Sequence, residues 1–228
     1  MQFTLVRAWF QSQTPCCLCS GKIKRTSSYT NPLICRICNT TLSILPCGLD
    51  ITENSVAEQL VCRNVDGIAV IGIYQWPLSA WLTKLKFNQQ LHFSRLIGYL
   101  LARQVEQQDW PKIELICALP LHYRRWVIRG FNQSQVILTE FLQEIDIPMY
   151  NGLLRRRHTK AQSTQNRANR LSNLDEAFVA TIPIHGKSVL LIDDVLTTGA
   201  TLKAATIALK NAGATRVYVA CGAIRLVN

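Results

Sequence analysis

The sequence predicts an α/β protein in which a mostly parallel sheet carries helices on both faces, preceded by a small cysteine-rich head. From residue 66 onward, short apolar runs alternate with amphipathic helical stretches, which is typical of such a sheet. The first 65 residues hold two C-x2-C pairs instead. A length of 228 residues suits one main domain with a smaller appendage, so we expect domains at residues 1–65 and 66–228.

Two cysteine knuckles define the head. Cys16 and Cys19 form the first pair, and Cys35 and Cys38 form the second after fifteen intervening residues. This spacing is typical of a structural zinc site, in which four thiolates surround Zn2+ and leave no position for a catalytic water. The alternative is reduced cysteines packed as small hydrophobic residues. Spacing alone leaves Cys17 open as the first ligand, and we choose Cys16 because it preserves the two-residue gap.

Zinc binding would also help the head to fold. About 65 residues with few large apolar side chains cannot easily bury a core, so zinc binding would supply the missing free energy. The role of Cys47 and Cys62 stays open, because two thiols alone make a poor zinc site. Cys117 and Cys221 lie in apolar runs and are expected to be core residues.

The elements of the main domain follow from the period of the apolar residues. Apolar runs indicate strands, and apolar residues three and four positions apart indicate helices. The predicted strands are residues 67–74, 115–119, 188–192 and 216–221, and the predicted helices are residues 78–85, 93–105, 133–142 and 201–211. Gly213 closes the last helix.

A phosphate-binding loop is predicted between the strand at 188–192 and the helix that follows it. Asp193 and Asp194 come directly after the strand, where open α/β sheets bind ligands. The paired acids can accept hydrogen bonds from sugar hydroxyls or hold Mg2+. The next residues supply hydroxyls, a glycine and backbone N-H groups at a helix start, which suit an anion: Thr197, Thr198, Gly199, Ala200 and Thr201. A helix cap with a turn would explain one acid and the glycine, but not two acids and three threonines.

The charge favours a polyanionic partner. Twenty-five Lys and Arg stand against 14 Asp and Glu, a net charge of +11, and nine of the basic residues fall between positions 119 and 173. A solvated basic face is the alternative. The start of the chain lacks the apolar run of a secretory signal, and no apolar run is long enough to span a bilayer, so we expect a cytoplasmic protein without membrane insertion.

The loop at 193–201 resembles the signature of type I phosphoribosyltransferases for 5-phosphoribosyl 1-pyrophosphate. Nearly the whole chain is similar to the ComF/GntX family of competence-associated proteins, which combine a cysteine-knuckle head with a phosphoribosyltransferase domain. The matching pieces are the two knuckles, Leu85-Lys86-Phe87, Pro120-Leu121, Arg129-Gly130-Phe131-Asn132-Gln133, Thr159 with Gln162, Arg170 with Asn173, Ala177-Phe178 and the loop itself.

The resemblance implies roles for individual residues. Asp193 and Asp194 would contact ribose hydroxyls and Mg2+, and residues 197–201 would bind the 5-phosphate. Arg124 and Arg129 would be phosphate ligands, unless they are ordinary surface arginines. Residues 155–164 would form a hood over the substrate, with these contacts: Arg157, Thr159 and Gln162. The chemistry of the class displaces pyrophosphate through an oxocarbenium-like state, which needs charge stabilisation more than a strong base.

The resemblance also implies a part in DNA uptake during natural transformation, with single-stranded DNA and uptake-machinery proteins as partners. Two hypotheses remain at this point. The domain is either a phosphoribosyltransferase with an unidentified acceptor, or a non-catalytic module that uses the same fold to bind single-stranded DNA or protein. Trp126 and Phe131, interleaved with basic residues, could stack on bases in the second case, although core packing is the alternative for both.

Overall fold

The computed structural model describes residues 15–23, 33–42, 44–53, 64–87, 90–156 and 177–226. Residues 1–44 and 45–228 form two compact units. The second unit therefore includes a segment before residue 66 that the sequence assigned to the head. The segment packs on the first strand, because Leu45 N-H donates to the carbonyl of Ile71 and Ile68 N-H donates to Asp50.

The predicted strands and helices occur in the expected order, together with short elements that the sequence did not predict. The first unit contains the short helix α2 (Arg36–Thr41), and the second begins with the 3-10 turn η1 (Ile51–Glu53). The strands of the second unit are β1 (Gly67–Ile73), β2 (Leu115–Ala118), β3 (Leu153–Arg155), β4 (Phe178–Ala180), β5 (Ser188–Leu196) and β6 (Arg216–Ile224). Its helices are α3 (Leu78–Phe87), α4 (His92–Glu106), α5 (Tyr123–Arg129), α6 (Gln133–Phe141) and α8 (Ala200–Asn211).

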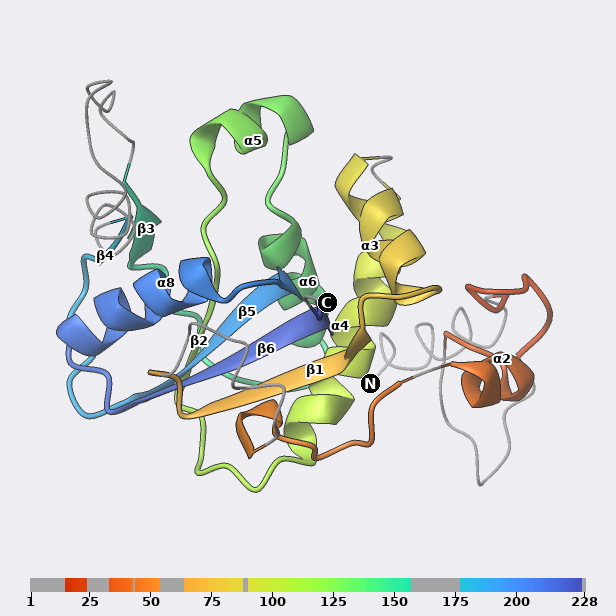
Figure 1. Cartoon of the computed structure of the whole chain (residues 1–228), viewed down its shortest axis with the longest axis horizontal. Coiled ribbons are helices and arrows are strands. Elements are labelled where there is room, and N and C mark those ends of the chain that lie inside the picture. The colour runs from red at the N-terminus through yellow and green to blue at the C-terminus, as the bar shows by residue number, and fades with distance from the viewer. Residues whose placement is uncertain are drawn as a thin grey trace, which may run out of the picture. The chain divides into compact units, whose positions relative to one another are not determined.

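Four strands form a parallel sheet in the order β1-β6-β5-β2, which confirms the predicted fold class (Figure 1). Leu190 of β5 lies between Tyr218 of β6 and Ile116 of β2 in register. The strands are near-continuous apolar runs because helices cover both faces of a parallel sheet. Strands β3 and β4 pair separately and antiparallel.

The two faces of the sheet use alternate side chains of the same strands. Val189 and Leu191 of β5 join the core that packs against Leu202 and Leu209 of α8. Leu190 and Ile192, also fully buried, point to the opposite face, which α4 and α6 cover (Figure 1). The layers are therefore helix, sheet, helix, and the carboxyl ends of β5 and β2 lie at one edge.

Two expected boundaries need correction. β5 continues to Leu196, so Asp193 and Asp194 lie within the strand and not after it. β6 likewise extends beyond residue 221, and Ala223 pairs with Val195. β6 supplies backbone partners that extend β5 beyond the two acids. Pairing with a distant strand cannot be predicted from the local sequence. Within the described residues no helix is both long and apolar enough to cross a membrane.

Candidate ribose-phosphate site

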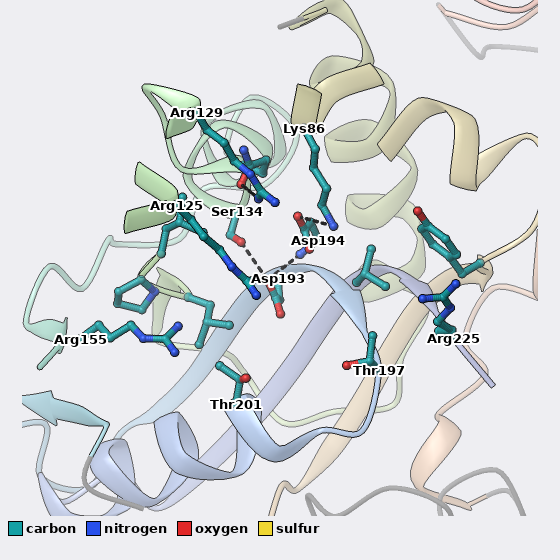
Figure 2. A pocket seen from close by; sticks show the side chains of 16 residues that line it. Lys86, Arg125, Arg129, Ser134, Arg155, Asp193, Asp194, Thr197, Thr201 and Arg225 are labelled. Carbon is teal, nitrogen blue, oxygen red and sulfur yellow. Dashed lines mark hydrogen bonds and ion pairs between the residues drawn. The ribbon is translucent and has the colours of Figure 1, made fainter. Parts of the chain in front are cut away.

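A cavity of about 350 Å3 opens at the carboxyl end of β5 (Figure 2). Asp193 and Asp194 lie at its centre, and Thr197 and Thr201 lie on one side of it. Five basic side chains also line it: Lys86, Arg125, Arg129, Arg155 and Arg225. Five positive charges against two carboxylates suit a ligand that carries several negative charges.

Asp193 is held by its neighbours. Its Oδ1 accepts a hydrogen bond from the Ser134 hydroxyl at 2.9 Å and another from the Asp194 N-H at 2.8 Å. Ser134 is fixed in turn because it lies in the first turn of α6, where the Asn132 side chain caps the helix by accepting from Ser134 N-H. Burial and the adjacent Asp194 carboxylate raise the pKa of Asp193 to about 7, although the two hydrogen bonds and Lys86 oppose the shift.

Asp194 is paired with a lysine from another element. Lys86 lies in the last turn of α3, and its Nζ is 2.9 Å from Asp194 Oδ2. Both side chains are largely withdrawn from solvent, with exposed fractions of 16% and 14%. The two acids therefore have different partners. Asp193 accepts hydrogen bonds from neutral donors, whereas Asp194 forms an ion pair with a lysine.

The loop after β5 offers backbone donors to an anion. Gly199 adopts φ +78°, a left-handed conformation that favours glycine, and it caps the start of α8. Gly199 has no side chain that could cap the helix, and the first N-H groups of α8 point out of its N-terminus. Thr198 Oγ1 accepts from Ala200 N-H at 3.4 Å. The loop thus combines backbone amides at a helix start, threonine hydroxyls and the helix dipole.

The arginines on the other side of the cavity come from α5 and β3. Arg129 lies with its guanidinium 5.2 Å from the Phe87 ring centre and donates to Gln133 Oε1 at 3.0 Å. Arg155 lies in the same way 5.1 Å from the ring of Phe178. Aromatic contacts hold these guanidinium groups in place while leaving donors for a ligand.

The structure brings together most of the residues predicted for the site. Asp193, Asp194, Thr197, Thr201 and Arg129 line the cavity, and Thr198, Gly199 and Ala200 complete the loop between them. Arg124 is exposed and is not among the lining residues, whereas its neighbour Arg125 is. The predicted hood contacts lie outside the described residues: Arg157, Thr159 and Gln162.

Sequence reasoning missed several lining residues, namely Lys86, Arg125, Ser134 and Arg225, and it placed Arg155 in the hood without assigning it a contact. Lys86 could have been found from the sequence, because Leu85-Lys86-Phe87 is one of the motifs that resemble the family. The motif alone did not indicate that the lysine lies at the site. Ser134 and Arg225 had no such signal, because their proximity to β5 depends on how α6 and β6 pack.

The cysteine cluster lies in the first unit. The sulfur atoms of Cys16, Cys19, Cys35 and Cys38 all lie within 4.8 Å of one another. Cys19 Sγ and Cys35 Sγ are 3.7 Å apart, and Cys35 N-H donates to Cys16 Sγ at 3.3 Å. Burial raises the pKa of the Cys16 thiol, but hydrogen bonds from backbone N-H groups outweigh burial and lower it to about 7. The geometry groups Cys16, and not Cys17, with the other three.

Comparisons with known proteins agree with this geometry. A family model described as a phosphoribosyl transferase domain matches residues 132–225. Competence protein F of Haemophilus influenzae is 30% identical over 213 residues, which cover 89% of this chain and 88% of that protein. The DNA utilization protein YhgH of Escherichia coli K12 is 29% identical over 218 residues, which cover 90% of this chain and 88% of that protein.

Two further similarities are more partial. Competence protein ComFC of Streptococcus pneumoniae is 31% identical over 161 residues, which cover 68% of each chain. A solved structure of the allosteric regulatory enzyme of purine biosynthesis shares 19% identity and a TM-score of 0.42 over 61% of this chain and 30% of its own.

Proposed function

The chain belongs to the competence protein F family, and from that premise we propose that its phosphoribosyltransferase-like domain binds 5-phosphoribosyl 1-pyrophosphate. One observation carries the proposal. The pair Asp193 and Asp194 lies beside the loop at residues 197–201, in one cavity that five cations line. The ligand has ribose hydroxyls in its middle and a phosphoryl group at each end. The hydroxyls match the acids at the centre of the cavity, and the phosphoryl groups match the donors on its two sides.

Each part of the ligand has a chemically suitable partner. The 5-phosphate would bind at the N-terminus of α8, where Gly199 allows close approach of the backbone. The ribose hydroxyls would donate to Asp193 and Asp194. The pyrophosphate would lie against Arg125, Arg129 and Arg155, which offer forked donors to phosphoryl oxygens. The contacts from Arg157, Thr159 and Gln162 belong to the same proposal.

Mg2+ suits the acid pair because carboxylate oxygens are the ligands that this hard cation prefers. When bound with the ligand, it would neutralise the charge that develops on the departing pyrophosphate. The protein's own part is to place the hydroxyls on the acids and to keep water from the anomeric carbon. Transfer of the phosphoribosyl group would need an acceptor, and the described residues do not define one.

Zn2+ is proposed for the cysteine cluster of the first unit. Tetrahedral zinc with four sulfur ligands places the sulfur atoms about 3.8 Å apart, and the 3.7 Å between Cys19 Sγ and Cys35 Sγ matches that spacing. The backbone N-H that Cys35 donates to Cys16 Sγ is the kind of hydrogen bond that orients a thiolate ligand. The metal would be structural, since all four positions are filled by protein.

We further propose that the protein acts in the cytoplasm on incoming DNA during natural transformation. The names of its relatives, competence protein F and DNA utilization protein, support this role. The net charge of +11 favours a nucleic-acid partner or a partner complex that contains one.

Calorimetry with 5-phosphoribosyl 1-pyrophosphate and Mg2+ tests the site. We expect binding to the wild-type protein and its loss in the double variant Asp193→Asn with Asp194→Asn. Melting curves of both proteins control for folding. Absence of binding to the wild-type protein at millimolar ligand would overturn the proposal.

Helix α5 favours a second candidate function, namely binding of single-stranded DNA. None of its residues is buried, and the side chains of Tyr123 and Trp126 are 53% and 51% exposed. They flank the adjacent residues Arg124 and Arg125, and basic groups next to exposed aromatic rings suit a stacked, unpaired strand. Phe131, the other aromatic residue named from sequence, is only partly exposed.

Fluorescence anisotropy with a labelled oligo(dT) tests this candidate. We expect affinity to fall steeply with salt, and Trp126→Ala to weaken binding by about fivefold or more, as loss of one stacking partner does. The triple replacement of Arg155, Arg156 and Arg157 by Ala should flatten the salt dependence. Binding that is absent, or independent of salt, would remove single-stranded DNA as a direct partner.

A further inference from the structure

The ion pair between Lys86 and Asp194 lies inside the proposed ligand site. Lys86 reaches the acid pair from α3, more than one hundred positions earlier in the chain, and its Nζ is 2.9 Å from Asp194 Oδ2 (Figure 2). Both residues line the cavity. A lysine of the protein thus already occupies one oxygen of the carboxylate pair that the proposed function assigns to ribose and Mg2+.

Two adjacent carboxylates at a poorly solvated site need a positive charge nearby. Burial and mutual repulsion both disfavour two ionised acids, and a cation within about 4 Å offsets this cost. Among the described residues, Lys86 is the one cation that bonds directly to either acid. Arg155 acts on Asp193 only through longer-range attraction. Lys86 therefore places a positive charge beside Asp194 in the absence of a metal ion.

Lysine and a divalent cation compete for the same oxygen. Mg2+ binds carboxylate oxygens at about 2.1 Å in near-octahedral geometry, and an ammonium group 2.9 Å from Asp194 Oδ2 leaves no space for that ion on the same lone pairs. Within the described residues, the remaining polar contacts of the acids come from Ser134 and the Asp194 N-H, which are neutral. The ammonium therefore occupies, at Asp194 Oδ2, the place that a metal ion would otherwise take.

We propose that Lys86 is the resident counter-ion of the acid pair, so that ribose phosphate binds there without a divalent cation on Asp194. The inference rests on the proposed ribose-phosphate site and revises one part of it, namely the contact between Mg2+ and Asp194. It assigns the need for Mg2+ to the pyrophosphate end of the full ligand. Ribose 5-phosphate, which lacks pyrophosphate, should then bind independently of Mg2+. Lys86 is a positioning residue in this scheme, because it acts through Asp194.

Calorimetry with ribose 5-phosphate, in EDTA and in excess Mg2+, tests the inference. Wild-type affinity should differ by less than about twofold between the two conditions, and Lys86→Met should weaken binding about tenfold in EDTA, the size expected for losing a charged hydrogen bond. Mg2+ should restore most of that loss, because the metal can now bind Asp194. Lys86→Arg keeps the positive charge and should stay independent of metal.

Lys84→Met is the matched control. Lys84 lies on the same helix, but its Nζ contacts the Phe93 ring at 5.5 Å and it does not line the cavity. The control loses the same charge and should bind ribose 5-phosphate like the wild type in both conditions. A second measurement uses Asp194→Asn with Lys86→Met, which removes the charge that needs a counter-ion. The double variant should be insensitive to Mg2+, unlike Lys86→Met alone.

The outcomes separate this inference from the proposed function. If wild-type protein binds ribose 5-phosphate only with Mg2+, or if Lys86→Met and wild type respond equally to EDTA, the counter-ion assignment is wrong while the site stands. If wild type binds neither ribose 5-phosphate nor 5-phosphoribosyl 1-pyrophosphate at millimolar concentration, the proposed function itself is overturned.

Discussion

The hydroxyl of Ser134 donates a 2.9 Å hydrogen bond to the carboxylate of Asp193, across 59 positions of sequence. The bond joins the first turn of α6 to the carboxyl end of β5. It fixes one acid of the pair while Lys86 from α3 fixes the other. The candidate site is therefore organised before any ligand binds, which lowers the entropic cost of binding.

The pKa of Asp193 leads to a prediction about stability and pH. Burial and Asp194 raise this pKa from 3.8 to about 7, so between these values the folded protein holds a proton that the unfolded chain has lost. Stability should therefore decline as pH rises through this window and stay reduced above it. Asp193→Asn removes the titration and should raise the melting temperature by several degrees more at pH 8 than at pH 5. An equal effect at both pH values would contradict the raised pKa.

Adjacent arginines of α5 offer a matched pair. Both side chains are exposed, but only Arg125 lines the cavity. Arg125→Ala should weaken binding of inorganic pyrophosphate about tenfold, as loss of a charged hydrogen bond does. Arg124→Ala should leave that affinity within about twofold, because Arg124 does not line the cavity and salt screens an exposed charge that makes no direct contact. Calorimetry at 0.15 M salt gives both values. Equal losses would mean that only the total charge matters.

A comparison of Gly199→Ala with Gly186→Ala separates an effect on folding from an effect on ligand binding. It has φ +78°, and Gly186 has φ +76° with open space where a Cβ would lie. Alanine at either position should cost about 1 kcal/mol of stability, because an L side chain disfavours this conformation. Only Gly199→Ala should also weaken ribose 5-phosphate binding, since Gly199 lies at the phosphate end of the site. Urea unfolding and calorimetry measure the two effects, and a comparable binding loss in Gly186→Ala would argue against a local role.

The zinc site makes a prediction that distinguishes two neighbouring thiols. Purified protein should contain about one equivalent of zinc. Cys16→Ser should lose the metal and lower the stability of the first unit, because a hydroxyl is a poor zinc ligand. Cys17→Ser should retain zinc, since the cluster includes Cys16 and not Cys17. Metal analysis after gel filtration checks both variants. Retention of zinc by Cys16→Ser would contradict the four-cysteine assignment.

Local patterns were enough to predict the four strands of the parallel sheet and four of the helices of the α/β unit. Apolar runs around Leu190 and Val219 predicted buried parallel strands, and the helical spacing of Leu96 and Ile97 predicted α4. The short helix α5 was not predicted, because none of its residues is buried and so no apolar period marks it. The limits of β5 were also missed, since the pairing of Val195 with Ala223 extends it beyond the apolar run.

The sequence by itself predicted the main strands and helices, the segment 193–201 with its two acids and three threonines, and the two cysteine pairs, because each depends on contiguous residues. Only the tertiary structure decided which cations meet the acids. Lys86, Arg125 and Arg225 come from α3, α5 and the end of β6, and the packing of these elements against β5 brings them to one cavity. Proximity of this kind arises from long-range packing, and no local pattern of residues encodes it.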